Sequence, residues 1–449
     1  MSAPAATTQA RFLTGSTMRH VTIMTLTGAL GLMSLFLVDL VDLFFLSMLN
    51  QTEVTAAIGY AGTIVFTNLS VSIGTGIAAA ALVARNLGAG NVERAREYAT
   101  SSLLFALIIS AIITLMIASG SGALLSLLGA QGEAKRLALV FIWTMTPGYI
   151  LITGAVCCSF ILRGLGDAKR AMYITLSSAI ITAIADPIFI FGLGWGIQGA
   201  AAATVLGYLV SFGIGIHGVS RVHRFLNPMR LAGLKRDFSA IWAIALPAML
   251  TQLATPFANA YVTYEVAPFG DEAVAASAII GRVIPVAFGM IFSLSGSVGP
   301  IIGQNFGAGR FDRVKQTLKD GLIFSAIYTL VTSALLFVFR HEIAEAFNAS
   351  GRTVDIVVFF CTFIAVSWAF AGAQFVSNAA FNNLGRPNLS TYFNWAKATI
   401  GTIPFAMAGA SFAGPEGVLV GTAVGSVIFG IASVFAAYRI ADRSGGPKP

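Results

Sequence analysis

The 449-residue sequence has little charge, because Asp, Glu, Lys and Arg together make up only 10% of it, against about 25% in an average soluble domain. Hydrophobic residues make up 56%, and the mean hydropathy is +0.82. A soluble core cannot use this much apolar surface. We therefore interpret the chain as one integral membrane unit without a sizeable soluble domain.

Cysteine and histidine are also scarce. The three cysteines, Cys157, Cys158 and Cys361, have neither zinc-ligand nor CxxC spacing. The four histidines lie at span ends or in loops, and the motifs HExxH, GxxxxGK(S/T) and GxSxG do not occur in the sequence. These absences argue against a membrane enzyme, and we expect no resident metal and no cofactor. The sequence also has no filter repeat of the kind that ion channels use.

Long apolar runs are what the sequence has in abundance. A hydrocarbon core about 30 Å thick requires about 20 helical residues, and runs of this length recur from end to end. The polar N-terminus lacks the order of a cleavable signal, so the first run is predicted to remain as a span. We predict an all-α integral membrane protein with twelve transmembrane helices, at residues 20–48, 55–84, 98–120, 136–162, 171–193, 197–219, 239–266, 273–303, 317–339, 353–380, 390–412 and 415–439.

The longest basic loop, residues 221–237, divides the chain almost in half. With the N-terminus in the cytoplasm, 21 of the 27 Lys and Arg residues lie in cytoplasmic segments and four lie in outer loops. This bias is a strong positive-inside signal, so both termini are predicted to be cytoplasmic, with the chain in the inner (plasma) membrane. The bias also accounts for the net charge of +8 without a nucleic-acid partner.

Residues 83–97 (VARNLGAGNVERARE) and 302–316 (IGQNFGAGRFDRVKQ) are copies of one motif, 219 residues apart and with five identities. We therefore predict two six-helix lobes, 1–220 and 239–449, joined by a cytoplasmic linker at 221–238. Six is an even number, so both lobes insert in the same orientation and are expected to be related by a pseudo-two-fold axis along the membrane normal. Such repeats are common in secondary transporters, whose substrates bind near the midplane. Duplication for stability alone is the alternative.

Charges inside the spans are the rarest feature, and each costs about 2.5–3.5 kcal/mol at a helix centre on insertion scales. Asp39 and Asp42, in the stretch LFLVDLVDLFFL, are three residues apart and lie within about 60° of each other on one helix face. Desolvation and mutual repulsion favour the protonated form of such a pair. The pair can therefore bind a proton, an organic cation or Na⁺. The alternative is an ion pair with Arg282 or Lys397 that only holds helices together.

Asp186 is a third candidate, because Pro187 follows it within a span. A proline removes a backbone donor and frees carbonyls upstream. A carboxylate beside freed carbonyls suits a proton or a sodium ion, whereas the alternative is an ordinary acid at a helix end.

These features together resemble the MATE family, the multidrug and toxic compound extrusion transporters, over nearly the whole chain. The resemblance rests on the order and spacing of several motifs, none of them specific alone. These are the first-span acid followed by AAIG (56–59), the paired QNxGAG-like turns (85–90 and 304–309), LRGLGD (162–167), and the DP pair followed by GxxGAAxAT (196–204). Arg282 in the eighth span and the pattern Asn394-Trp395-Ala396-Lys397 in the eleventh resemble the residues at these places in members of the DinF-like branch.

The resemblance implies a secondary antiporter for multidrug efflux, with a role in antibiotic resistance. It exports bulky, mostly cationic organic compounds in exchange for inward H⁺, with Na⁺ as the alternative ion. The family's first-span aspartate maps onto Asp42, its fifth-span aspartate onto Asp186, and its sixth-span threonine onto Thr204. Thr182 stands where many members have Asn, and the proline found in the first span of some members is absent here.

We expect Asp42, Asp39 and Asp186 to handle the coupling cation, and Na⁺, if it couples, to bind at Asp42, Asp186 and Thr204. Protonation in the outward-facing state would expel the compound, and inward release of the proton would let the next one bind. The candidates for the substrate cavity are Thr182, Thr204, Arg282, Asn394 and Lys397.

A flippase for a lipid-linked or amphipathic substrate is the second hypothesis. Such a protein is expected to line its cavity with several basic residues, and within the spans only Arg282 and Lys397 are available. We expect small organic molecules as substrates, membrane lipid as the surroundings, and a monomer.

Overall fold

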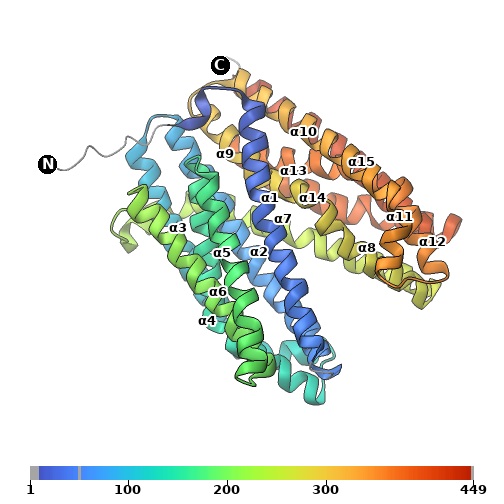
Figure 1. Cartoon of the computed structure of the whole chain (residues 1–449). Coiled ribbons are helices and arrows are strands. Elements are labelled where there is room, and N and C mark those ends of the chain that lie inside the picture. The colour runs from blue at the N-terminus through green and yellow to red at the C-terminus, as the bar shows by residue number, and fades with distance from the viewer. Residues whose placement is uncertain (1–9, 49–51, 446–449) are drawn as a thin grey trace. The chain divides into compact units, whose positions relative to one another are not determined.

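The computed structural model describes residues 10–48 and 52–445, and this part of the chain is helical, with no strand. The all-α prediction is therefore confirmed. The helices of eight or more residues are α1 (Thr17–Ser47), α2 (Thr52–Gly88), α3 (Val92–Leu127), α4 (Gly132–Gly164), α5 (Ala168–Pro187), α6 (Gly196–His217), α7 (Leu231–Val266), α8 (Asp271–Ala287), α9 (Gly289–Gly307), α10 (Phe311–Val338), α12 (Arg352–Phe359), α13 (Trp368–Asn383), α14 (Asn388–Ala396) and α15 (Ile403–Gly445) (Figure 1).

The number of membrane spans agrees with the prediction. Over the described residues, ten helices are long and apolar enough to cross a membrane, and α8 with α9, bent by 45° at their break, make an eleventh. The candidate at Asn388–Ser444 has 57 residues and non-helical backbone at Ala413 and Gly414. At 1.5 Å per residue it is too long for one crossing, so it holds two spans and the total is twelve.

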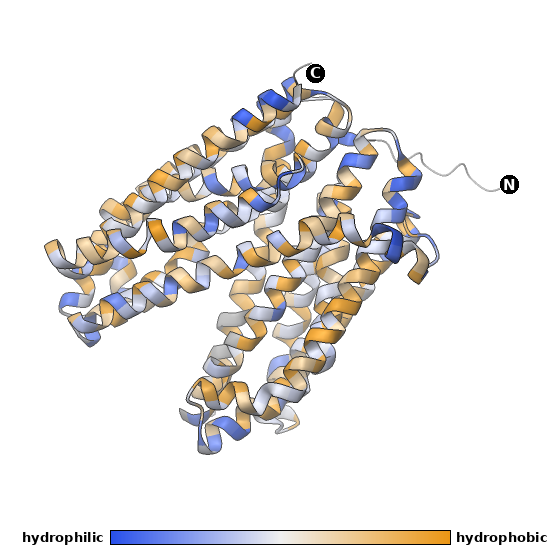
Figure 2. Cartoon of the chain, turned by 180° about the vertical axis from the view of Figure 1, so that it is seen from behind, coloured by the Kyte–Doolittle hydropathy of each residue, from blue (hydrophilic) through white to orange (hydrophobic). Residues whose placement is uncertain are grey.

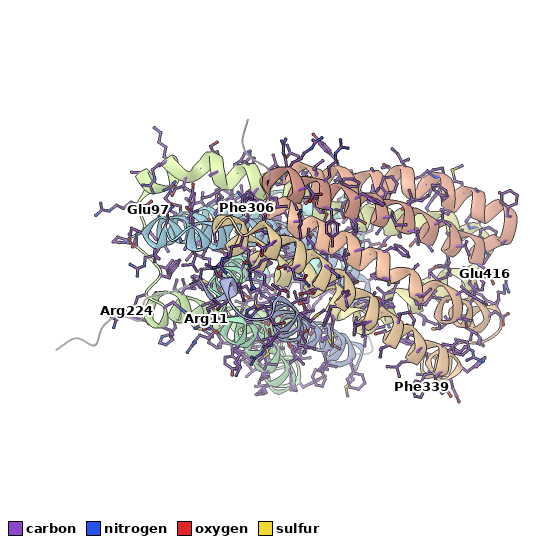
Figure 3. The ribbon with its side chains drawn as sticks, turned by 90° about the horizontal axis from the view of Figure 1, so that it is seen from above. Arg11, Glu97, Arg224, Phe306, Phe339 and Glu416 are labelled. Atoms are coloured by element: carbon purple, nitrogen blue, oxygen red, sulfur yellow. The ribbon has the colours of Figure 1, made fainter. Side chains whose placement is uncertain are left out.

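Hydropathy follows this arrangement. Figure 2 shows hydrophobic residues along the lengths of the helices and hydrophilic residues concentrated towards their ends. In the C-terminal half, Figure 3 shows Phe306 at one end of the helices and both Phe339 and Glu416 at the other. The loops of these helices therefore alternate between two ends, as a multi-pass membrane protein requires.

The chain packs into two compact units, the first built from Leu30–Met249 and the second from Phe12–Ala29 and the chain from Leu250 onward. The predicted lobes, 1–220 and 239–449 with a linker at 221–238, follow the sequence repeat, whereas these units follow the packing. As a result, α1 and α7 each contribute to both units. The two segments that pack with the other half, Phe12–Ala29 and the part of α7 up to Met249, occupy corresponding positions in the repeat.

In the second unit, the first half of α1 packs against α9 and α10. The Ser297 hydroxyl donates to the Met24 carbonyl over 3.0 Å, and the Ser293 hydroxyl donates to the Thr25 carbonyl over 3.2 Å. Thr17 donates to the buried Asp320 carboxylate. These bonds satisfy polar groups that the hydrocarbon could not satisfy, and they fix the start of α1 to this unit.

In the first unit, the start of α7 is held in the corresponding way. Asp237 is fully buried, and its carboxylate lies 2.8 Å from the Arg94 guanidinium and accepts from the Ser101 hydroxyl over 2.6 Å. Arg313 is the repeat counterpart of Arg94, and it donates to the Phe12 carbonyl over 2.9 Å. The copy at 83–97 therefore holds the start of α7, and the copy at 302–316 holds the segment just before α1, so each copy holds the beginning of the other repeat.

Glycines allow the helical segments before and after the break at Ala413 and Gly414, which run antiparallel, to pack closely against each other. A side chain at Gly417 would collide with the backbone of Gly409, and one at Gly421 would collide with the backbone of Phe405. Small residues at such contacts let helix backbones approach in a membrane, where van der Waals packing supplies much of the association energy.

Candidate functional site

The first unit holds the acidic candidates. Asp186 lies on the last turn of α5 and is fully buried, and neither of its carboxyl oxygens has a hydrogen-bond partner among the described residues. The helix changes after Pro187 to a π-helical turn at Ile188–Gly192, a local irregularity that often marks functional sites. Asp42 on α1 is half-buried, and its charge interacts with that of Asp186. The structure thus brings together two predicted acids that are far apart in the sequence.

The remaining candidates of this unit lie on neighbouring helices. Thr182 is buried on α5, one turn before Asp186, and Thr204 on α6 is half-buried, with its hydroxyl donating to the Ala200 carbonyl over 3.1 Å. Asp39 lies in α1, but its side chain falls outside the described residues, so its role stays a prediction. The described residues contain no group of three or more His, Cys, Asp or Glu side chains that could hold a metal ion.

The second unit contains a cavity of about 420 Å³, within the range of small-molecule sites. Its aromatic wall is built around Trp368, which lies 5.7 Å from Phe292 in an edge-to-face arrangement. Lys397 and Asn394, two of the candidates for the substrate cavity, are among its lining residues. Arg282 is exposed on α8 and is not one of the lining residues, so its predicted role in the cavity has no support from this geometry.

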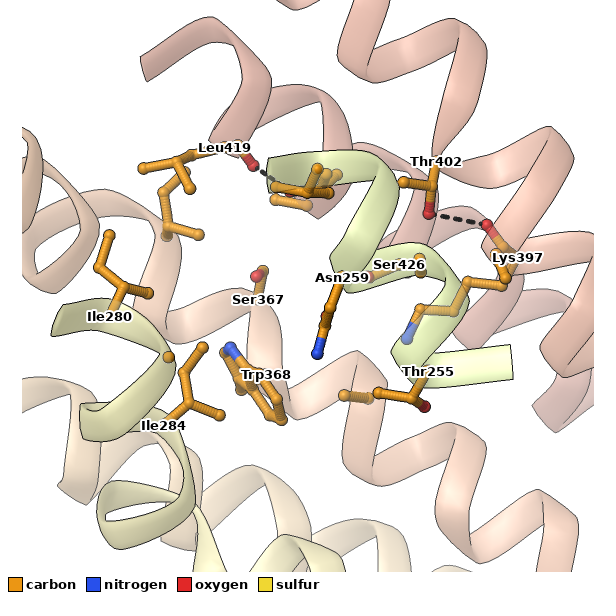
Figure 4. Close-up of a pocket in the computed structure, with 18 of the residues that line it drawn as sticks. Thr255, Asn259, Ile280, Ile284, Ser367, Trp368, Lys397, Thr402, Leu419 and Ser426 are labelled. Carbon is orange, nitrogen blue, oxygen red and sulfur yellow. Dashed lines mark hydrogen bonds between the residues drawn. The ribbon is translucent and has the colours of Figure 1, made fainter. Parts of the chain in front are cut away.

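Lys397 is placed by an irregular stretch of helix. It begins a π-helical turn, Lys397–Gly401, and its carbonyl accepts from the Thr402 hydroxyl over 2.9 Å. Figure 4 shows the ammonium end of Lys397 extending into the cavity towards Asn259 and Thr255. Among the described residues, no ion pair or hydrogen bond to this ammonium is found, and none of the residues that line the cavity is acidic.

Sequence reasoning missed the amides of this cavity, namely Asn259, Gln374 and Asn378. Gln374 is 3% exposed, and its side-chain nitrogen has no hydrogen-bond partner among the described residues. An amide buried in a membrane span is costly for the same reason as a charge, because its donors and acceptors lose water. A search for amides inside apolar runs would have found all three.

The LRGLGD motif has a structural role at the helix ends. Asp167 caps α5 by accepting from the Arg170 backbone N–H over 3.2 Å, and it lies 2.8 Å from the His223 ring nitrogen in the linker. Burial alone raises the pKa of Asp167, but the hydrogen bonds from His223 and Arg170 outweigh burial and hold this pKa well below its usual value. The carboxylate thus stays ionised and ties the linker to the fifth helix.

The fold and these sites define a class, the multi-pass membrane transporters built from two helical units. The sequence profile of the MatE family matches residues 29–188 and 247–408. The chain therefore belongs to the MatE family and is a transporter rather than an enzyme, as the resemblance predicted. Assignment to the DinF-like branch stays a prediction.

Individual relatives agree with this placement. The chain is 29% identical to the FAD transporter of Shewanella oneidensis over 93% of this chain and 94% of that protein. It is 22% identical to the multidrug export protein MepA of Staphylococcus aureus, with 89% of each chain covered. The crystal structure of the Vibrio cholerae MATE transporter VcmN in its bent form superposes with a TM-score of 0.90 at 25% identity, covering 95% of this chain and 98% of that one.

Proposed function

We propose that this protein is a secondary active multidrug exporter that expels bulky, mostly cationic organic compounds in exchange for inward H⁺, with Na⁺ as the alternative ion. MatE family membership and the similarity to MepA support efflux as the activity. The coupling ion and the charge of the compounds rest on the acids of the first unit.

The observation that carries the coupling proposal is the environment of Asp186. An ionised carboxylate that is fully buried without a hydrogen-bond partner is strongly destabilised. The negative charge of Asp42 increases this cost. A proton or a monovalent cation removes the cost, so the pair takes up a cation whenever one can reach it, and an organic cation competes for the same charges.

Two further properties of the chain belong to this proposal. The bias of 21 basic residues against four supports an inner-membrane location with both termini in the cytoplasm. The monomer predicted from the sequence also stays a proposal. The flippase for lipid-linked substrates gains no support from the second-unit cavity, because Lys397 is the only basic residue among the described residues that line it.

The test is ethidium efflux from cells that express the wild type, Asp42→Asn or Asp186→Asn, with Glu133→Gln as a matched control at an exposed acid. We expect at least a tenfold loss of efflux rate in the first two variants and none in the control. Collapse of the pH gradient should stop wild-type efflux with or without Na⁺. Undiminished efflux by Asp42→Asn would refute the coupling mechanism, and efflux that requires Na⁺ would change the ion.

A further inference from the structure

We infer that the cavity of the second unit is a cargo site for anionic, planar aromatic compounds, with Lys397 as the counter-charge. The inference deepens the proposed function, because the role of the cavity as a cargo site rests on export. It adds a class of cargo opposite in charge to the cations that the acids of the first unit attract.

The first observation behind this inference is the positive charge of the cavity. Lys397 supplies one positive charge, its ammonium points into the cavity, and the described lining residues contain no Asp or Glu. A partly buried ammonium without a carboxylate nearby is destabilised by lost hydration. An anionic group of the cargo would restore a counter-charge, whereas a cationic cargo would meet a like charge in a medium of low dielectric constant.

The hydrogen-bonding groups of the cavity also favour an anionic cargo. The buried Gln374 nitrogen is a donor without a partner among the described residues, and Asn259 extends towards the same space as Lys397. Buried donors gain most from a strong acceptor, and bonds to a charged acceptor are the stronger kind. Phosphate and carboxylate oxygens are acceptors of this kind.

The shape of the wall indicates an aromatic body for the cargo. Trp368, Phe292 and Phe375 line the cavity, and Phe292 meets both of the others edge to face. The Trp368 ring is held from behind by the fully buried Phe288, which stacks on it at 5.0 Å with an interplanar angle of 7°. Such a cluster offers flat, polarisable surfaces that bind ring systems with little ordering of side chains. The cavity volume of about 420 Å³ lies within the range that holds drug-sized molecules.

The experiment uses two probes with the same ring system, riboflavin without a phosphate and flavin mononucleotide with one. Their affinities for the purified full-length protein in detergent micelles are measured by fluorescence anisotropy, with empty micelles as the blank. We expect the mononucleotide to bind at least tenfold more tightly than riboflavin. Lys397→Gln should abolish this preference, Lys397→Arg should retain most of it, and Lys135→Gln, in a predicted outer loop, should leave it unchanged.

Ethidium efflux by the wild type and by Asp42→Asn, measured beside the flavin binding, separates this inference from the proposed function. A single monodisperse peak of Lys397→Gln in size-exclusion chromatography would show that this variant is folded. Equal binding of the two flavins to the wild type, or an undiminished preference in Lys397→Gln, would overturn the inference even if ethidium efflux depends on Asp42. A lost preference in Lys397→Gln alone, together with efflux indifferent to Asp42, would refute the coupling mechanism and leave the site standing.

Discussion

The Asp167 cap allows a quantitative test of how the linker is held. In Asp167→Asn the side chain can still cap α5, because Asn and Asp are about equally good caps, but the charge that binds His223 and Arg170 is lost. The Arg170 side chain is 45% exposed, so its ion pair contributes little. The His223 side chain is 12% exposed, and a hydrogen bond between a buried carboxylate and this ring is worth about 1.5–3 kcal/mol.

We therefore expect Asp167→Asn to lose about 2 kcal/mol, which corresponds to about 4–8 °C in the unfolding midpoint for a unit of this size. Cys157 and Cys158 are fully buried in the first unit, so a thiol-reactive dye in a Cys361→Ala background reports the unfolding of that unit. Glu133→Gln, at an exposed acid in the same unit, should stay within about 1 °C of the wild type.

The pH dependence of this effect has a definite sign. The folded pKa of Asp167 lies below its usual value, so the stabilisation is complete above the unfolded value of about 3.9 and is lost as the pH falls through the folded pKa. The difference between Asp167→Asn and the wild type should be full at pH 7 and shrink only below about pH 4. A midpoint within 1 °C of the wild type at pH 7 would refute the argument that the charge holds the linker.

Three further predictions concern the packing of the units. Arg313→Ala removes two hydrogen bonds of about 3 Å to backbone carbonyls of the segment before α1. Tryptic cleavage at Arg11 should therefore accelerate at least fivefold. Gly417→Val places a side chain against a facing backbone and should cost more than about 3 kcal/mol, abolishing folded yield, whereas Gly281→Ala meets open space and should not. Arg94→Ala removes the guanidinium that lies 2.8 Å from the buried Asp237 carboxylate, but Arg236 still lies 3.0 Å from it, so the variant should lose only about 1.5–3 kcal/mol, the contribution of one charged hydrogen bond, in a thiol-dye assay of the first unit.

The sequence was sufficient for the spans, because they depend on composition along the chain. Each predicted span corresponds to an apolar helical segment, and Asp42 and Asp186 were identified from the cost of a charge in hydrocarbon. The first half of α1 packs with the second repeat, and the start of α7 packs with the first repeat. This exchange of helix halves was not predicted, because periodicity shows which face of a helix is apolar but not which helix covers it. The amides around Gln374 were missed because only charges were counted as costly.

The exchange of helix halves also bears on how this chain is made and how it arose. The first unit needs the start of α7, which the ribosome produces only after the whole first repeat, so that unit cannot finish folding until Met249 has been translated. Separate expression of the two sequence halves should therefore give two incomplete units. An ancestor consisting of one repeat would have needed a second copy of itself to supply the missing segment, as domain-swapped dimers do.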